Sequence, residues 1–178
     1  MKKFAALLIA LIMLLSVAAM AEETTEALYT AENGTTVTLT MKGEYTINAA
    51  KTDNGETLYW KLSREGVADV YVIITPLDEI TGLNDLTDEQ IDEIMDQYAE
   101  EYGDVVTASV EVTPSGNKYI NCFWDENGSQ MEERWTYFEG FELNCFQASV
   151  GEALTEEDTA FLAEVQEGMW VAFPETAE

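Results

Sequence analysis

The sequence predicts an α+β protein with a predominantly antiparallel sheet, a C-terminal meander of three strands, and two amphipathic helices that cover the sheet. The meander is predicted over residues 117–150, where aromatic and β-branched residues fill three runs. Turn signals at 125–128 and 139–140 separate the runs and place a glycine where a hairpin needs positive φ. In the first run, 119–124, large apolar side chains fall on both faces. Because both faces must then be covered, we expect helices as the cover.

The first helix is predicted to begin after Thr87, which forms a capping box with Gln90. Its apolar stripe has helical spacing, while the rest of its surface over 88–101 carries acids and no lysine. Gly103 supplies a C-cap. The stripe consists of Ile91, Ile94, Met95, Tyr98 and Tyr102.

The second helix is predicted to follow Thr155 and to end near Gly168, with acids in its first turn as the helix dipole favours. Its buried stripe is Phe161, Leu162, Val165 and Met169. Trp170, Val171 and Phe173 remain apolar beyond the glycine, so we expect this stretch to dock as a strand or coil.

Alternation of apolar and polar residues predicts further strands ahead of the first helix and ahead of the meander. In 35–41, Val37, Leu39 and Met41 face inward and the threonines between them face outward. Leu58, Trp60 and Leu62 line the inner face of another strand, and the apolar run 70–75 is typical of a central strand. Shorter strand patterns occupy 45–49 and 105–113.

The chain opens with Lys2 and Lys3, an apolar stretch and the small-residue triplet Ala19-Met20-Ala21. This pattern is typical of an export signal, so we expect residues 1–21 to be removed and the protein to be secreted or extracytoplasmic. We further expect a flexible acidic leader over 22–34, one domain over 35–173 and a short tail over 174–178.

The order of elements, together with a final helix followed by the aromatic stretch Met169-Trp170-Val171-Ala172-Phe173, resembles the PsbP-like α/β/α sandwich family. That family includes photosystem extrinsic subunits and DcrB-type exported bacterial proteins. The resemblance covers about residues 35–173 and implies a sandwich that acts as a binding or accessory module. It carries over no functional residue. Cystatin-like and lipocalin-like sheets remain alternatives for the fold.

The chain has 35 acidic and 8 basic residues, for a formal net charge of −27. Such a charge repels phosphate backbones and anionic lipid surfaces, which argues against nucleic acid and, after cleavage of the signal, against membrane as partners. It favours a basic protein or a cationic surface.

The sequence contains no histidine, which removes imidazole bases and the usual zinc sites. Cys122 and Cys145 are predicted on the two outer strands of the meander, too far apart for a disulfide, so we expect free, buried thiols. Glu132 and Glu133 are neighbours on one strand and should face opposite sides, which spoils them as an acid and base pair. We therefore predict no catalytic residue and no enzyme activity.

Two acidic turns, 53–56 and 125–128, superficially resemble calcium loops but lack the alternating ligand spacing, and hairpin turns explain both. No metal ligand or cofactor is predicted. At least three of Trp60, Trp124, Trp135 and Trp170 are expected in the core, although an exposed one would suit a carbohydrate or protein partner.

The sequence thus favours a non-catalytic exported binding module of strongly acidic character. A small extracellular hydrolase that uses carboxylates and a calcium-responsive accessory domain remain the alternatives.

Overall fold

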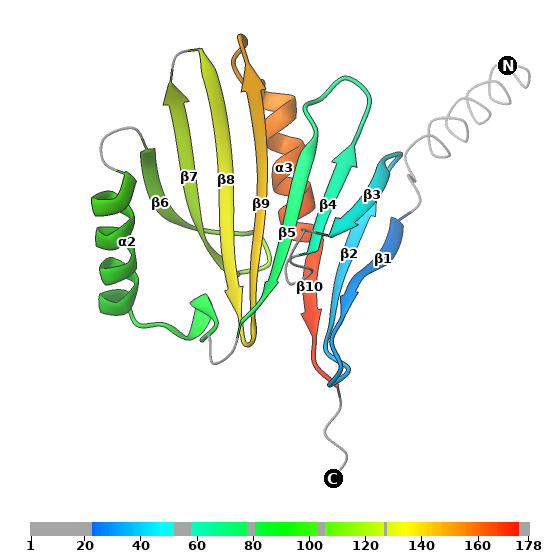
Figure 1. The fold of residues 1–178 in the computed structure, drawn as a ribbon, viewed down its shortest axis with the longest axis vertical. Helices are drawn as coiled ribbons and strands as arrows, with labels where there is room; N and C mark the ends of the chain where they lie inside the picture. The colour runs from blue at the N-terminus through cyan, green and yellow to red at the C-terminus, as the bar shows by residue number, and fades with distance from the viewer. Residues whose placement is uncertain (1–22, 52–57, 78–80, 103–105, 127, 175–178) are drawn as a thin grey trace, which may run out of the picture.

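In the computed structural model of the chain (Figure 1), the described residues are 23–51, 58–77, 81–102, 106–126 and 128–174. They form two antiparallel sheets and two α-helices. The predicted export signal at 1–21 lies outside the described residues.

The first sheet has three strands in the order β1-β2-β10. These are β1 (Glu23–Thr30), β2 (Thr36–Lys42) and β10 (Met169–Ala172). The second sheet has seven strands in the order β3-β4-β5-β9-β8-β7-β6. These are β3 (Thr46–Lys51), β4 (Leu58–Ser63), β5 (Val70–Pro76), β6 (Val106–Val112), β7 (Lys118–Glu126), β8 (Ser129–Phe138) and β9 (Phe141–Val150).

The helical elements follow β5 and β9. A short 3₁₀ turn, η1 (Leu83–Asp85), precedes α2 (Asp88–Tyr102), and α3 (Glu156–Gly168) leads directly into β10. None of the helices in the described part of the chain has the length and hydrophobicity needed to cross a membrane.

The meander β7-β8-β9 has the strand order that the sequence predicts, and its second turn lies at 139–140 as expected. Gly140 adopts a φ of 80° in the β8–β9 turn, a conformation that side chains with a Cβ rarely adopt. The predicted alternation in β2 is also confirmed, because Val37, Leu39 and Met41 are all buried.

The prediction of one sheet covered by two amphipathic helices, a PsbP-like sandwich, is wrong. The segments at both ends of the described chain pair with each other instead, since β10 joins β2 with Met169 opposite Leu39 and Val171 opposite Val37. Strand β1 forms on the other side of β2, over residues that the sequence assigns to a flexible leader. These strands form a second sheet whose apolar face packs on the main core, in place of the helix that the sequence pattern predicts there.

Helix α3 lies in the main core, where it contacts β2 on one side and β9 and β5 on the other. Thr155 caps it as predicted: its Oγ1 accepts from the Asp158 backbone at 3.2 Å, and the Asp158 carboxylate accepts from the Thr155 backbone at 2.7 Å. A Cβ at Gly168 would overlap the Thr40 carbonyl oxygen, so only glycine lets the helix end this close to β2.

We call the face of the seven-stranded sheet that carries Val72, Leu143 and Arg134 the inner face, because α3 and the three-stranded sheet pack on that side. The opposite face is the outer face. Helix α2 and η1 cover its β6–β8 part, where Leu83, Ile91, Ile120 and Cys122 form a second core. Figure 1 shows α3 behind β5 and β9 and α2 at the β6 end of the sheet.

Candidate functional site

A buried ion pair lies on the inner face, where apolar residues would be expected. Arg134 and Glu132 are two positions apart on β8 and therefore share that face. The Arg134 Nε and Nη2 atoms donate to Glu132 Oε1 at 3.1 and 2.7 Å. The two residues are only 7% and 6% exposed, so this pair is shielded from water.

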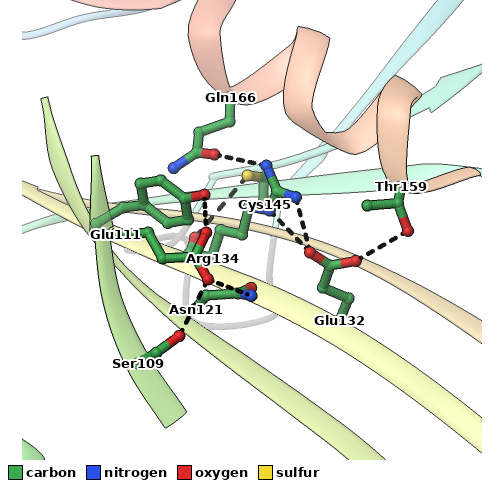
Figure 2. A network of polar contacts seen from close by, with 9 residues as sticks. Ser109, Glu111, Asn121, Glu132, Arg134, Cys145, Thr159 and Gln166 are labelled. Atoms are coloured by element: carbon green, nitrogen blue, oxygen red, sulfur yellow. Dashed lines mark hydrogen bonds and ion pairs between the residues drawn. The ribbon is translucent and has the colours of Figure 1, made fainter. Parts of the chain in front are cut away.

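Helix α3 supplies the remaining partners of this pair. Gln166 Oε1 accepts from Arg134 Nη1 at 3.0 Å, and Thr159 Oγ1 donates to Glu132 Oε2 at 3.2 Å. Figure 2 shows Gln166 and Thr159 pointing from the helix toward the two charged side chains on the sheet. The ion pair thus holds α3 in register on β8.

Glu111 on β6 is the centre of a second group of polar contacts on the same face (Figure 2). Its carboxylate accepts from Tyr119 Oη at 2.6 Å, Ser109 Oγ at 3.0 Å and Asn121 Nδ2 at 3.3 Å. These bonds, the one from Tyr119 above all, lower the pKa of Glu111. Burial and the bond to Glu111 raise the pKa of Tyr119 to about 12, and the Arg134 guanidinium lies 5.4 Å from the Tyr119 ring centre.

Together these groups are suited to structure rather than chemistry. The guanidinium already donates to Glu132 and Gln166, and its charge is balanced by Glu132. A reacting group needs access to substrate, whereas Arg134 and Glu132 are buried under α3. The sequence offered a signal for this pair, because residues two apart on a strand share a face, but nothing local identified Gln166 as the partner.

Glu133 lies on the outer face, opposite Glu132, as predicted. Asn144 Nδ2 donates to its Oε1 at 2.6 Å. Burial raises the pKa of Glu133 despite this bond, and burial together with the charge of Glu133 raises the pKa of Glu142 on β9. Two carboxyls with raised pKa values therefore share one face, a feature that sequence reasoning missed although strand alternation places Glu142 there.

The two cysteines are free and buried, as expected. Cys122 on β7 belongs to the outer core and Cys145 on β9 to the inner core, with β8 between them. Burial raises their pKa values to about 11 and about 12, so both remain protonated thiols at neutral pH.

Of the four tryptophans, Trp60 is buried, Trp124 and Trp135 are partly buried, and Trp170 is 57% exposed. Trp60 belongs to the main core and Trp135 packs against the second one, so two of the four contribute to the described cores rather than the expected three. Trp170 is the exposed one that the sequence could not identify. Its neighbours Met169 and Val171 face the core, so alternation along β10 turns the indole outward.

Three aromatic rings form a row on the outer face, one each from β4, β5 and β9. Tyr59 stacks on Tyr71 with ring centres 5.7 Å apart, and Tyr71 stacks on Phe146 at 5.2 Å. All three side chains are only partly buried; α3 packs on the inner face of β5 and β9, and α2 contacts β6. Sequence reasoning missed this aromatic row because it assigned helix cover to both faces.

The predicted turn at 53–56 lies outside the described residues, as does Asn127 of the turn at 125–128. In the described part of the chain, no group of three or more Cys, Asp or Glu side chains is placed to hold a metal ion.

No protein-family model matches this chain, and no curated protein matches its sequence. The resemblance to the PsbP-like family therefore stays a prediction.

Proposed function

We propose that this chain is an exported, non-catalytic binding module that contacts a basic protein through the aromatic row of Tyr59, Tyr71 and Phe146. The observation that carries the proposal is the stacking of three partly exposed rings on the outer face of β4, β5 and β9, whereas α3 packs on the inner face of β5 and β9. Aromatic side chains dominate many protein interfaces because they bury a large area at a small cost in conformational entropy.

Charge supports a basic partner. The chain carries a net charge of −27, and Lys61, a cation next to the row on β4, is paired with Asp69 at 2.5 Å. The hydrogen bond to Asp69 raises the pKa of Lys61. Arginine and lysine side chains of a partner would gain both from the acidic surroundings and from stacking on tyrosine rings.

A carboxylate-dependent hydrolase is the second candidate, and the raised pKa values of Glu133 and Glu142 on one face favour it. An enzyme of this type needs an open cleft between its two carboxyls. Three large cavities are lined by described residues, and neither Glu133 nor Glu142 lines any of them. This favours the binding module over the hydrolase.

The proposal can be tested by capture with the immobilised protein from extracts of secreted and surface proteins, at low and at moderate salt. We expect the wild type to retain a basic protein, and we expect its binding to weaken as the salt concentration rises. The double variant Tyr59→Ala/Tyr71→Ala should lose it at both salt concentrations, because hot-spot aromatics contribute about 2 kcal/mol or more each.

Trp170→Ala is the matched control, since it removes an exposed aromatic ring from the other sheet. It should retain the partner, and thermal melting should show that all variants are folded. Equal capture by the wild type and the double variant would contradict the proposal.

A further inference from the structure

A groove of ≈ 760 Å³ opens between the two sheets, within the size range of small-molecule sites. It lies at the end of the molecule where the β1–β2 turn and the β8–β9 turn come together, the lower end in Figure 1. None of the residues of the aromatic row or of the Arg134 ion pair lines it.

Hydrogen bonds and close packing hold both walls of the groove. On the side of the three-stranded sheet, the Ala31 backbone donates to Thr35 at 2.8 Å, and Pro174 lies against Gly34. On the other side, the Leu77 backbone donates to the Gly140 carbonyl at 3.0 Å. A groove built this way needs little ordering when a ligand binds.

Aromatic rings provide the apolar part of the lining. Tyr29 and Phe141 meet edge to face with ring centres 5.7 Å apart, and Phe173 lies at the rim with 51% of its surface exposed. The electron-rich faces of such rings attract cations, above all alkylammonium groups.

The charged residues among the described lining are both acidic. They are Asp85, whose carboxylate stands beside Gly82, and Glu139 in the β8–β9 turn. No lysine or arginine occurs among the described lining residues, so an anionic ligand would meet repulsion with nothing to offset it.

Aromatic rings and carboxylates in one groove suit a cation that carries an apolar body. We propose that this groove binds a small organic cation, an ammonium group attached to an apolar or aromatic body. The body packs against Tyr29, Phe141 and Phe173, and the ammonium group lies toward Asp85 and Glu139. This site is separate from the aromatic row, so an experiment can refute the proposal for one without refuting the proposal for the other.

The test is a titration of the ¹⁵N-labelled protein followed by NMR, with three probes of the same shape: phenylpropylammonium, phenylpropanol and phenylpropanoate. The ammonium probe should produce saturable shifts at the amides of Thr35, Gly82 and Gly140, which line the groove. The neutral alcohol should bind about tenfold more weakly or worse, and the carboxylate should not saturate. Absence of saturable shifts with the ammonium probe, or equal binding of the alcohol, would overturn the proposal.

Variants separate a specific site from general attraction by an acidic protein. Asp85→Asn/Glu139→Gln keeps the shape of both side chains and should weaken the ammonium probe about tenfold. Glu93→Gln/Asp96→Asn removes the same charge from the exposed surface of α2 and should leave binding unchanged. Equal weakening by both double variants would show that only net charge matters and would refute the site.

Phe173→Ala tests the apolar part and lies in the chain beyond β10, where truncation leaves the sheet pairs intact. It should weaken the ammonium probe and the alcohol to a similar degree. An unchanged affinity for both would place the ligand elsewhere.

Discussion

The outer face of the seven-stranded sheet has two halves that differ in how deeply their side chains are buried. Under α2 and η1, Ile120 is fully buried and Cys122 is 2% exposed. Across β4, β5 and β9, the rings of Tyr59, Tyr71 and Phe146 stack on one another and stay partly exposed. The same alternation of side chains produces both halves, so the difference comes from what lies over them.

This difference shows that the apolar pattern of a strand does not predict which element packs against that face, or whether any element does. The half under α2 is covered by the chain itself and contributes to stability, whereas we propose that the half with the aromatic row contacts a partner. The predictions below test this division.

The largest effect is expected on stability in the covered half. Ile120→Ala leaves a cavity beneath η1 and should lower the free energy of unfolding by about 3 kcal/mol. Tyr71→Ala removes two partly exposed stacking contacts and should cost about 1 kcal/mol. Urea denaturation measures both, and a larger loss for Tyr71→Ala would show that the aromatic row belongs to the core.

A smaller effect is expected from removing the cap of α2. The Thr87 backbone donates to Gln90 Oε1 at 3.0 Å and the Gln90 backbone to Thr87 Oγ1 at 3.3 Å, so Thr87→Ala should cost the helix about 1 kcal/mol. Because α2 lies at the β6 end of the sheet, we expect the loss of helix stability to appear as faster amide hydrogen exchange within α2 alone.

Thr155→Ala is the matched change in α3, which lies in the main core. There the loss should appear as a lower free energy of global unfolding. Identical exchange patterns in the two variants would argue that both helices unfold with the whole molecule.

The smallest effects concern carboxyl groups on the two faces, and they have opposite signs. The raised pKa of Glu133 means that its contribution to stability is present below the ordinary value of 4.5 and is lost as pH rises through the raised pKa. Glu133→Gln keeps an acceptor for Asn144 and should therefore raise the urea midpoint at pH 7, with little change near about pH 3.5.

Glu111 on the inner face is the control. Its lowered pKa means that its contribution is present above the ordinary value of 4.5 and is lost as pH falls through the lowered pKa. Glu111→Gln should thus lower the urea midpoint at pH 7. If the urea midpoints moved in the same direction for both variants, the opposite pKa shifts of Glu133 and Glu111 would be contradicted.

Local signals in the sequence were sufficient for the meander and for both helix starts, because turns and caps depend on residues a few positions apart, as with Thr87 and Gln90. Pairing across the whole chain was not predictable in this way. The contact between β2 and β10 joins residues more than a hundred positions apart, and no turn or cap encodes it.

The candidate site shows the same limit. Alternation could place Glu132 with Arg134 and Tyr71 with Ile73, but the partner Gln166 and the openness of the aromatic row depend on where α3 and α2 lie. The exposure of Trp170 was equally hidden, because it follows from the pairing of β10 with β2, which turns Met169 and Val171 to the core and the indole outward.

The most direct test is hydroxyl-radical footprinting of the free protein, read by mass spectrometry. Two rings of the row have a buried counterpart of the same chemistry: Tyr119 for Tyr71, at 6% exposure, and Phe161 for Phe146, at 2%. We predict that Tyr71 and Phe146 are oxidised clearly faster than these counterparts. Equal rates would mean that another part of the chain covers the aromatic row, and would contradict its role as a contact surface.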